Sequence, residues 1–155
     1  MNKTNAARVL DKNAIVYELT EYKTDESDLS AASVAAKLGQ NVKQVFKTLV
    51  IKGDKTGIFV CVVPGDAEID LKNAAKVSGN KKAELIAVKD IMKFTGYVRG
   101  GCSPLAMKKE YPVFIDKSCL DFDFIYISAG IKGMQIKLNP QDLINVSKAK
   151  VCDLV

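Results

Sequence analysis

Lys47 lies in the middle of an apolar run, "VFKTLVI" (45–51), where an ammonium group would resist burial. Side chains of a strand alternate between its two faces, so Lys47 shares a face with Leu49 and Ile51, while Thr48 lies on the other. A lysine in this position can protect a strand edge from aggregation or extend its ammonium to water along its own methylenes. It can also be held in a cleft as a fixed cation for phosphate or carboxylate. The residues alone leave these alternatives open.

A second candidate is "GYVRGGCSP" (96–104), which has the composition of an anion-binding loop. Gly100-Gly101 allows positive φ and close approach of a ligand to bare backbone. Ser103-Pro104 resembles the N-cap and first position of a helical turn over "LAMKK". Backbone N–H groups beside a helix N-terminus suit a phosphate or the oxyanion of a tetrahedral intermediate. An ordinary tight turn is the alternative interpretation.

The chain contains no histidine, which removes Ser-His and Cys-His dyads and the commonest zinc ligand. Cys102 therefore has no imidazole to activate it as a nucleophile. The four cysteines are far apart and form no C-x-x-C pair, so we expect reduced thiols and neither a metal nor another cofactor. Any catalysis must use other groups.

Two further places are unremarkable when taken alone. Ser128 stands at the end of a strand in "YISAGIKG" (126–133), where Gly130 and Gly133 shape a hairpin turn. Tyr22 follows the first expected strand, in a polar loop where an exposed tyrosine is common.

The elements that must position these residues alternate irregularly between helix and strand. Helices are expected over 4–13, over 31–38 with Ser30 as N-cap and Gly39 as stop, over 71–79 and 89–94, and after Asn139-Pro140. Strands are expected over 14–19, 111–116, 122–128, 134–138 and the last six residues, with a hairpin around "GDKTG" (53–57). This pattern predicts an α/β (α+β) fold: a mixed, largely antiparallel sheet or partly closed barrel with surrounding helices.

The bulk composition is that of a globular protein. A chain of 155 residues supports a single domain over 1–155, and 48% hydrophobic with 26% charged residues argues against disorder. No apolar run is long enough to cross a bilayer, and the first residues lack a signal-peptide pattern, so we expect a cytoplasmic protein without a membrane partner. The net charge of +5 fits a polyanionic partner. A monomer is the default expectation.

Taken in order, five features resemble the YbaK family of aminoacyl-tRNA deacylases, also known as aminoacyl-tRNA editing domains. They are Tyr22, "FKTLV", "GYVRGGCSP", "ISAGIKG" and "LNPQDLINV", and they extend over nearly the whole chain. Members similar to this chain act in trans to remove cysteine attached by mistake to proline tRNA, often alongside prolyl-tRNA synthetase. Other members clear alanine or other small amino acids. The resemblance thus implies a YbaK-like fold and the acceptor end of an aminoacyl-tRNA as partner.

The resemblance also implies roles for individual residues. Lys47 would lie near the terminal adenosine and its phosphate, and Gly100 and Gly101 would present backbone N–H groups to the ester carbonyl. The substrate-binding positions that it implies are Tyr22, Thr48, Ser103, Ser128 and Gly130. The chain departs from the family pattern at Met134-Gln135, where many relatives carry a small or acidic residue.

In the cysteine-specific family the thiol of the substrate attacks its own carbonyl, which leaves a cyclic thioester that water later hydrolyses. A free thiol has a pKa of about 8.5, so an appreciable fraction is already thiolate near neutral pH. The implied function is hydrolysis of Cys-tRNA(Pro), extending to Cys-tRNA(Cys). The alternatives are a deacylase for another small amino acid, such as alanine on tRNA(Pro), and a non-catalytic module that binds tRNA or a synthetase.

Overall fold

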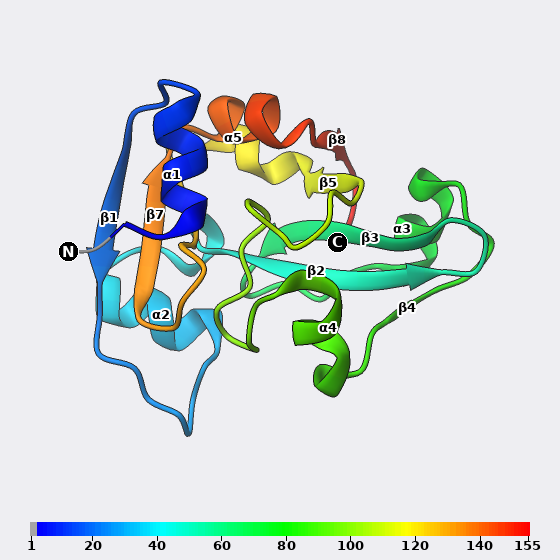
Figure 1. Ribbon diagram of the computed structural model, residues 1–155, viewed down its shortest axis with the longest axis horizontal. Coiled ribbons are helices and arrows are strands. Elements are labelled where there is room, and N and C mark those ends of the chain that lie inside the picture. Colours follow the sequence, from blue (N-terminus) through cyan, green and yellow to red (C-terminus); the bar gives the residue numbers. More distant parts are fainter. Residues whose placement is uncertain (1–2) are drawn as a thin grey trace.

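The computed structural model describes residues 3–155, whose strands form two sheets with helices packed around them (Figure 1). One sheet has the order β1-β7-β6 and the other the order β4-β2-β3-β5-β8. The strands are β1 (Tyr17–Glu21), β2 (Phe46–Gly53), β3 (Gly57–Pro64), β4 (Ala83–Leu85), β5 (Val113–Asp116), β6 (Ile125–Ser128), β7 (Met134–Leu138) and β8 (Lys150–Cys152). The α-helices are α1 (Asn5–Lys12), α2 (Ala31–Leu38), α3 (Leu71–Ser78), α4 (Ile91–Thr95) and α5 (Pro140–Ser147). Short 3₁₀ helices are η1 (Val42–Gln44), η2 (Val88–Asp90) and η3 (Lys117–Asp121).

Four of the helices begin where a short polar side chain can cap them. The side chains of Thr4, Ser30, Asp70 and Asn139 accept hydrogen bonds from the first free N–H groups of α1, α2, α3 and α5. Gly39 ends α2 in the left-handed conformation, with φ of +66°. The helices predicted over 4–13, 31–38, 71–79, 89–94 and after Asn139-Pro140 are confirmed, with ends that differ by at most two residues.

The predicted hairpin is also confirmed. β2 and β3 pair antiparallel over eight residues each, from Phe46 opposite Pro64 to Gly53 opposite Gly57. β5 joins β3 in parallel and β8 joins β5 in parallel, whereas the β1-β7-β6 sheet is antiparallel throughout. The predicted fold class, mixed and largely antiparallel, is confirmed, with the strands divided between two sheets.

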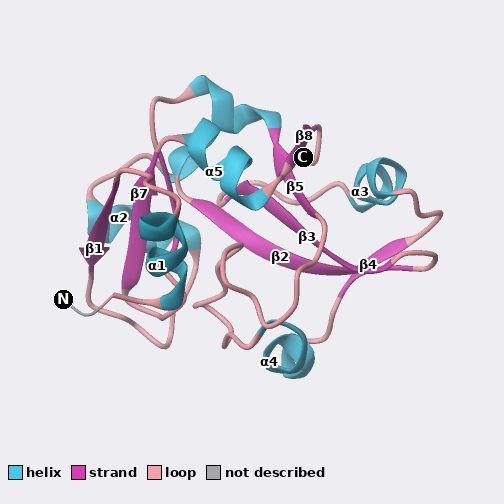
Figure 2. Ribbon diagram, turned by 45° about the horizontal axis from the view of Figure 1, so that its top comes forward, coloured by secondary structure: helices cyan, strands magenta, loops and turns pink. Residues whose placement is uncertain are grey.

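β3 separates the two largest cores because its side chains alternate between them. Val60 and Val62 face the core between the sheets, to which α1 contributes Leu10. Phe59 and Cys61 face the second core, which α3 covers. In both views α1 lies against the β1-β7 sheet, and α3 lies near the far end of the β2-β3 hairpin (Figures 1 and 2). This burial on both faces explains why β3 is a nearly continuous apolar run.

The sheets meet at one point and separate beyond it. Val45, just before β2, forms a parallel bridge with Tyr126 of β6. On the same edge of β2, β4 pairs only with Ile51–Gly53, and the Ile86 N–H donates to the Val50 carbonyl. Between these two attachments, no strand of residues 3–155 pairs with this edge of β2. This gap determines where a ligand can reach the sheet.

Two local predictions are wrong. The first strand begins at Tyr17 rather than at Ala14, which adopts φ of +56° after the end of α1. No helical turn follows Ser103-Pro104: the Ser103 hydroxyl accepts the Leu105 N–H at 3.3 Å, and Ala106 has a φ of +57°. Within residues 3–155, no helix is both long enough and apolar enough to span a bilayer.

Candidate functional site

A cavity of about 370 Å³ lies at the open edge of β2, where the two sheets separate. Five of the eight predicted site residues line it, contributed by the end of β1, by β2, by the loop before β5 and by the end of β6. They are Tyr22, Lys47, Thr48, Gly100 and Ser128. Residues separated by up to about a hundred positions in the sequence are thus brought together by the split between the sheets.

Lys47 is half-buried and anchored at its head. Its Nζ donates a hydrogen bond of 3.3 Å to the Gly65 carbonyl. Gly65 is fixed in turn by its N–H, which donates to the Val45 carbonyl at 2.8 Å. A Cβ at Gly65 would lie 2.1 Å from the Cβ of Ala31, so only glycine fits without a shift of α2. An ammonium has three donors, so the Lys47 head still has donors for a ligand in the cavity.

Two buried polar atoms in the cavity wall have no hydrogen-bond partner. They are the Oγ1 of Thr48 and the Oε1 of Gln135. The exposed fraction of Gln135 is 5%. Gln135 of the central strand β7 pairs with Ser128 of β6, so the two side chains lie on neighbouring strands, and Thr48 belongs to β2. Buried polar atoms are nearly always hydrogen-bonded, and one left unpaired costs about 1–3 kcal/mol. Both oxygens are covered by neighbouring atoms, so a hydrogen-bond donor of a ligand reaches them only if the wall shifts slightly.

The two adjacent glycines of the "GYVRGG" segment differ in position. Gly100 lines the cavity with φ of +85°, and within residues 3–155 its N–H has no hydrogen-bond partner. The N–H of Gly101 donates to the Val98 carbonyl at 3.0 Å, which closes a turn. A Cβ on Gly101 would lie 3.2 Å from the backbone of Ile131. Gly101 therefore allows close packing, and Gly100 is the member of the pair that can meet a ligand.

Ser103 and Gly130 also lie outside the residues that line the cavity. Ser103 is fully buried and holds its own turn. The Gly130 N–H donates to the Ser128 Oγ at 3.1 Å, and Gly130 has φ of +105°, which favours glycine. A Cβ there would lie 3.0 Å from the ring of Tyr97. Gly130 therefore orients Ser128 rather than contacting a ligand itself.

The cavity is electropositive. Lys47 and Arg99 both line it, and none of the described residues in its wall is an aspartate or glutamate. Arg99 is exposed and is not among the eight predicted site residues. Its place directly before the Gly100-Gly101 pair is the sequence signal that could have identified it. Two cations in a wall without a carboxylate suit a polyanionic ligand, although Asp25 and Asp28 line a small adjoining hollow.

Cys102 also lines the cavity but is not poised as a nucleophile. Burial raises the pKa of its thiol to about 11, so the thiol is neutral at physiological pH. Burial likewise raises the pKa of the Cys61 thiol to about 12 and that of Cys119 to about 11. In the described residues, the cavity wall thus holds neither a protein thiolate nor an imidazole.

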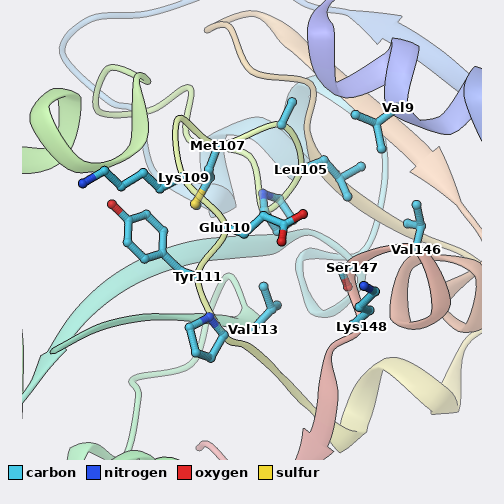
Figure 3. Close-up of a pocket in the computed structure, with 13 residues that line it drawn as sticks. Val9, Leu105, Met107, Lys109, Glu110, Tyr111, Val113, Val146, Ser147 and Lys148 are labelled. Carbon is cyan, nitrogen blue, oxygen red and sulfur yellow. The ribbon is translucent and has the colours of Figure 1, made fainter. Parts of the chain in front are cut away.

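Two larger hollows lie elsewhere on the protein. One of about 710 Å³ is lined by four lysines: Lys52, Lys72, Lys81 and Lys82. The other, of about 500 Å³, contains Lys109, Glu110 and Lys148 between the segment preceding β5 and the end of α5 (Figure 3). Neither contains any of the eight predicted residues.

Comparison with known proteins identifies the kind of domain that carries this cavity. Residues 26–146 match the family model described as "Aminoacyl-tRNA editing domain". The chain belongs to this family. The match includes every predicted site residue except Tyr22, and the family named from sequence motifs is confirmed.

Individual relatives of this editing domain support the same assignment. EbsC of Enterococcus faecalis is provisionally named a Cys-tRNA(Pro)/Cys-tRNA(Cys) deacylase. It is 43% identical to this chain, and the match covers 98% of this chain and 93% of EbsC. A proline–tRNA ligase of Fervidobacterium nodosum is 30% identical over 67% of this chain, which spans only 19% of the ligase. A crystal structure described as a provisional trans-editing enzyme for prolyl tRNA synthetase shares the fold, with a TM-score of 0.84, 23% identity and coverage of 99% and 98% of the two chains.

Gln135→Met tests whether the unpaired amide oxygen serves a ligand. Methionine has a similar length and no polar atom to leave unsatisfied, so the variant should be more stable to unfolding by about 1 kcal/mol. Release of the amino acid should slow, because a contact to the substrate is lost. Thermal denaturation and deacylation assays measure the two effects. A variant that is less stable and fully active would show that the amide has a structural role.

Proposed function

We propose that this editing domain is a trans-acting deacylase that removes cysteine from Cys-tRNA(Pro) and, by the same chemistry, from Cys-tRNA(Cys). The observation that carries the proposal is the combination in one cavity of an anchored ammonium, a free backbone N–H and unpaired polar atoms, without an imidazole or thiolate. Such a wall can hold an ester and stabilise negative charge, but it offers no strong nucleophile of its own.

Each part of an aminoacyl ester has a matching group. The Lys47 ammonium, with Arg99 near the mouth, suits the ribose and phosphate of the terminal nucleotide. The Gly100 N–H suits the oxyanion that forms on the ester carbonyl. After a small shift of the wall that exposes them, the unpaired oxygens of Thr48 and Gln135 can accept hydrogen bonds from the α-ammonium of the amino acid. Tyr22 and Ser128 complete the wall around the side chain of the substrate.

The missing nucleophile is supplied by the substrate. The cysteine sulfur attacks its own ester carbonyl carbon, and the new oxyanion is held by the N–H donor. When the tetrahedral intermediate collapses, the C–O bond to ribose breaks and the ribose oxygen takes up the proton that the thiol lost. The four-membered thioester that results is hydrolysed by water to free cysteine. The protein groups contribute position and charge stabilisation.

We further propose that the protein works beside prolyl-tRNA synthetase in the cytoplasm, where tRNA is charged. Two relatives support this link: the proline–tRNA ligase that contains a similar segment, and the neighbour described as a trans-editing enzyme for prolyl tRNA synthetase. Editing is needed because a synthetase pocket gains only about 1–3 kcal/mol from small differences in an apolar side chain. Cysteine and proline are similar enough in size to require it.

A release assay across misacylated tRNAs tests the proposal. Purified protein should release labelled cysteine from Cys-tRNA(Pro) well above the spontaneous rate, and alanine from Ala-tRNA(Pro) at the spontaneous rate. Faster release of alanine would instead assign the enzyme to that amino acid. Tight tRNA binding without release of any amino acid would refute catalysis and leave a binding module.

A further inference from the structure

Exposed apolar side chains gather on one segment next to the cavity. Of the large apolar residues that the structure leaves exposed, four fall within 85–98: Leu85 (49%), Val88 (56%), Met92 (50%) and Val98 (45%). They come from β4, η2, α4 and the loop that leads to Gly100. Burying each such side chain would be favourable, so a cluster of this kind marks a surface that a ligand or partner covers.

This segment forms one wall of a second hollow, of about 330 Å³. Leu85, Ile86, Val88 and Ile91 line its apolar side. The hollow shares five residues with the cavity described above: Thr48, Leu49, Arg99, Gly100 and Cys102. The two hollows are therefore adjoining compartments of one groove along β2, one polar and cationic and the other mainly apolar, with Arg99 and Gly100 between them.

We propose that the apolar compartment takes the terminal nucleobase of the aminoacyl-tRNA. This rests on the proposed function, because it requires the ester to lie in the polar compartment. The ester joins the amino acid to the ribose that carries the base, so the base must occupy a hollow that adjoins the ester. The flat faces of a base pack favourably on apolar side chains, and Arg99 at the boundary can contact ribose or phosphate.

The charges around the apolar compartment favour a nucleic acid over a protein surface. Lys89 and Lys93 are exposed on η2 and α4, and Arg99 is exposed on the following loop. The acidic residues on the same stretch are Glu84 of β4 and Asp90. Three cations against two carboxylates leave a positive excess that complements the phosphates preceding the terminal nucleotide. Docking of a protein partner on this surface is then the outcome that contradicts the proposal.

A paired comparison of neutral substitutions tests the compartment. The double variant Leu85→Asn/Val88→Asn removes apolar surface without changing charge. The double variant Leu120→Asn/Val151→Asn is the control, because these residues are also exposed (52% and 40%) and line neither hollow. All four side chains are partly in solvent, so both proteins should fold, which circular dichroism verifies. The probe is the trinucleotide CCA without an attached amino acid, whose affinity does not depend on deacylation.

The first variant should bind CCA at least tenfold more weakly than the wild type, and its KM for Cys-tRNA(Pro) should rise about tenfold. Its hydrolysis of cysteine methyl ester, which has no base, should be unchanged. The control variant should match the wild type in all three assays. Unchanged CCA affinity in the first variant would overturn the proposal. If the wild-type protein binds CCA but releases no cysteine from Cys-tRNA(Pro), the proposed function is refuted and the nucleobase compartment is not.

Discussion

Lys47→Ala is expected to lower kcat/KM for Cys-tRNA(Pro) by about 10²- to 10³-fold, the usual effect of removing one preorganised electrostatic contact. The Lys47 ammonium is held beside the cavity by the Gly65 carbonyl, so its loss removes a positioned charge rather than a mobile one. The measurement is single-turnover release of labelled cysteine. The melting temperature should change little, because the lysine head makes a single hydrogen bond and no ion pair among the described residues.

Lys52→Ala is the matched control for Lys47→Ala. Lys52 lies on the same strand but is exposed and outside the cavity. The Lys52→Ala variant should release cysteine at nearly the wild-type rate at moderate salt, because an exposed charge outside the cavity is largely screened from the substrate. Equal losses in the two variants would mean that Lys47 contributes only to the general positive charge. Full activity of Lys47→Ala would remove the lysine from the site.

Replacing the thiol of the substrate is expected to abolish the catalysed reaction. S-methylcysteinyl-tRNA(Pro) and Ser-tRNA(Pro) fit the same cavity but lack a group that is partly ionised near neutral pH, so their release should fall to the spontaneous rate. The α-amino group is the same in all three substrates, so any difference belongs to the side chain. Comparable release from Ser-tRNA(Pro) would indicate that the protein activates a water molecule instead.

The pH dependence of this reaction also follows from the thiol of the substrate. Loss of a proton creates the nucleophile, so the rate should rise with pH, about tenfold per unit well below the pKa of the substrate thiol, and level off near about 8.5. The protein thiol that lines the cavity would not level off near 8.5, since burial raises the pKa of Cys102 to about 11 and its thiolate fraction keeps rising up to that pH. The chain also has no histidine. A bell-shaped profile centred near neutral pH would contradict substrate assistance.

Much of the fold was predictable because its local signals agree with one another. Ser30 and Gly39 enclose α2 as a cap and a stop, and the turn between Gly53 and Gly57 sets the β2-β3 register. The helix expected after Ser103-Pro104 failed because the Ser103 hydroxyl bonds within its own turn, to the Leu105 N–H, which no pattern reveals. The division into two sheets depends on the long-range bridge between Val45 and Tyr126, which local periodicity does not encode.

The candidate site was predictable only in part, because some of its contacts join residues that are distant in the sequence. Lys47 and Gly100 stand out in the sequence as a charge in an apolar strand and a glycine in a pair. Gly65 matters through a distance to Ala31, a residue 34 positions earlier in the chain, so its role appears only in three dimensions. Gln135 could be recognised as unusual in its strand, but its unpaired oxygen is a property of the packed structure. Gly101 and Ser103 flank Cys102 in the chain and Gly130 donates to the Ser128 hydroxyl, but none of the three lines the cavity.

The central claim is that the cavity at the open edge of β2 holds the ester of Cys-tRNA between Lys47 and Gly100. A crystal structure with 3′-cysteinylamido-3′-deoxyadenosine 5′-phosphate, whose amide replaces the labile ester, tests it most directly. The account predicts that the amide carbonyl accepts a hydrogen bond from the Gly100 N–H, with the ribose or phosphate within reach of Lys47 Nζ. Binding of the analogue in the lysine-lined hollow near α3, or in the hollow of Figure 3, with the cavity empty, would contradict it.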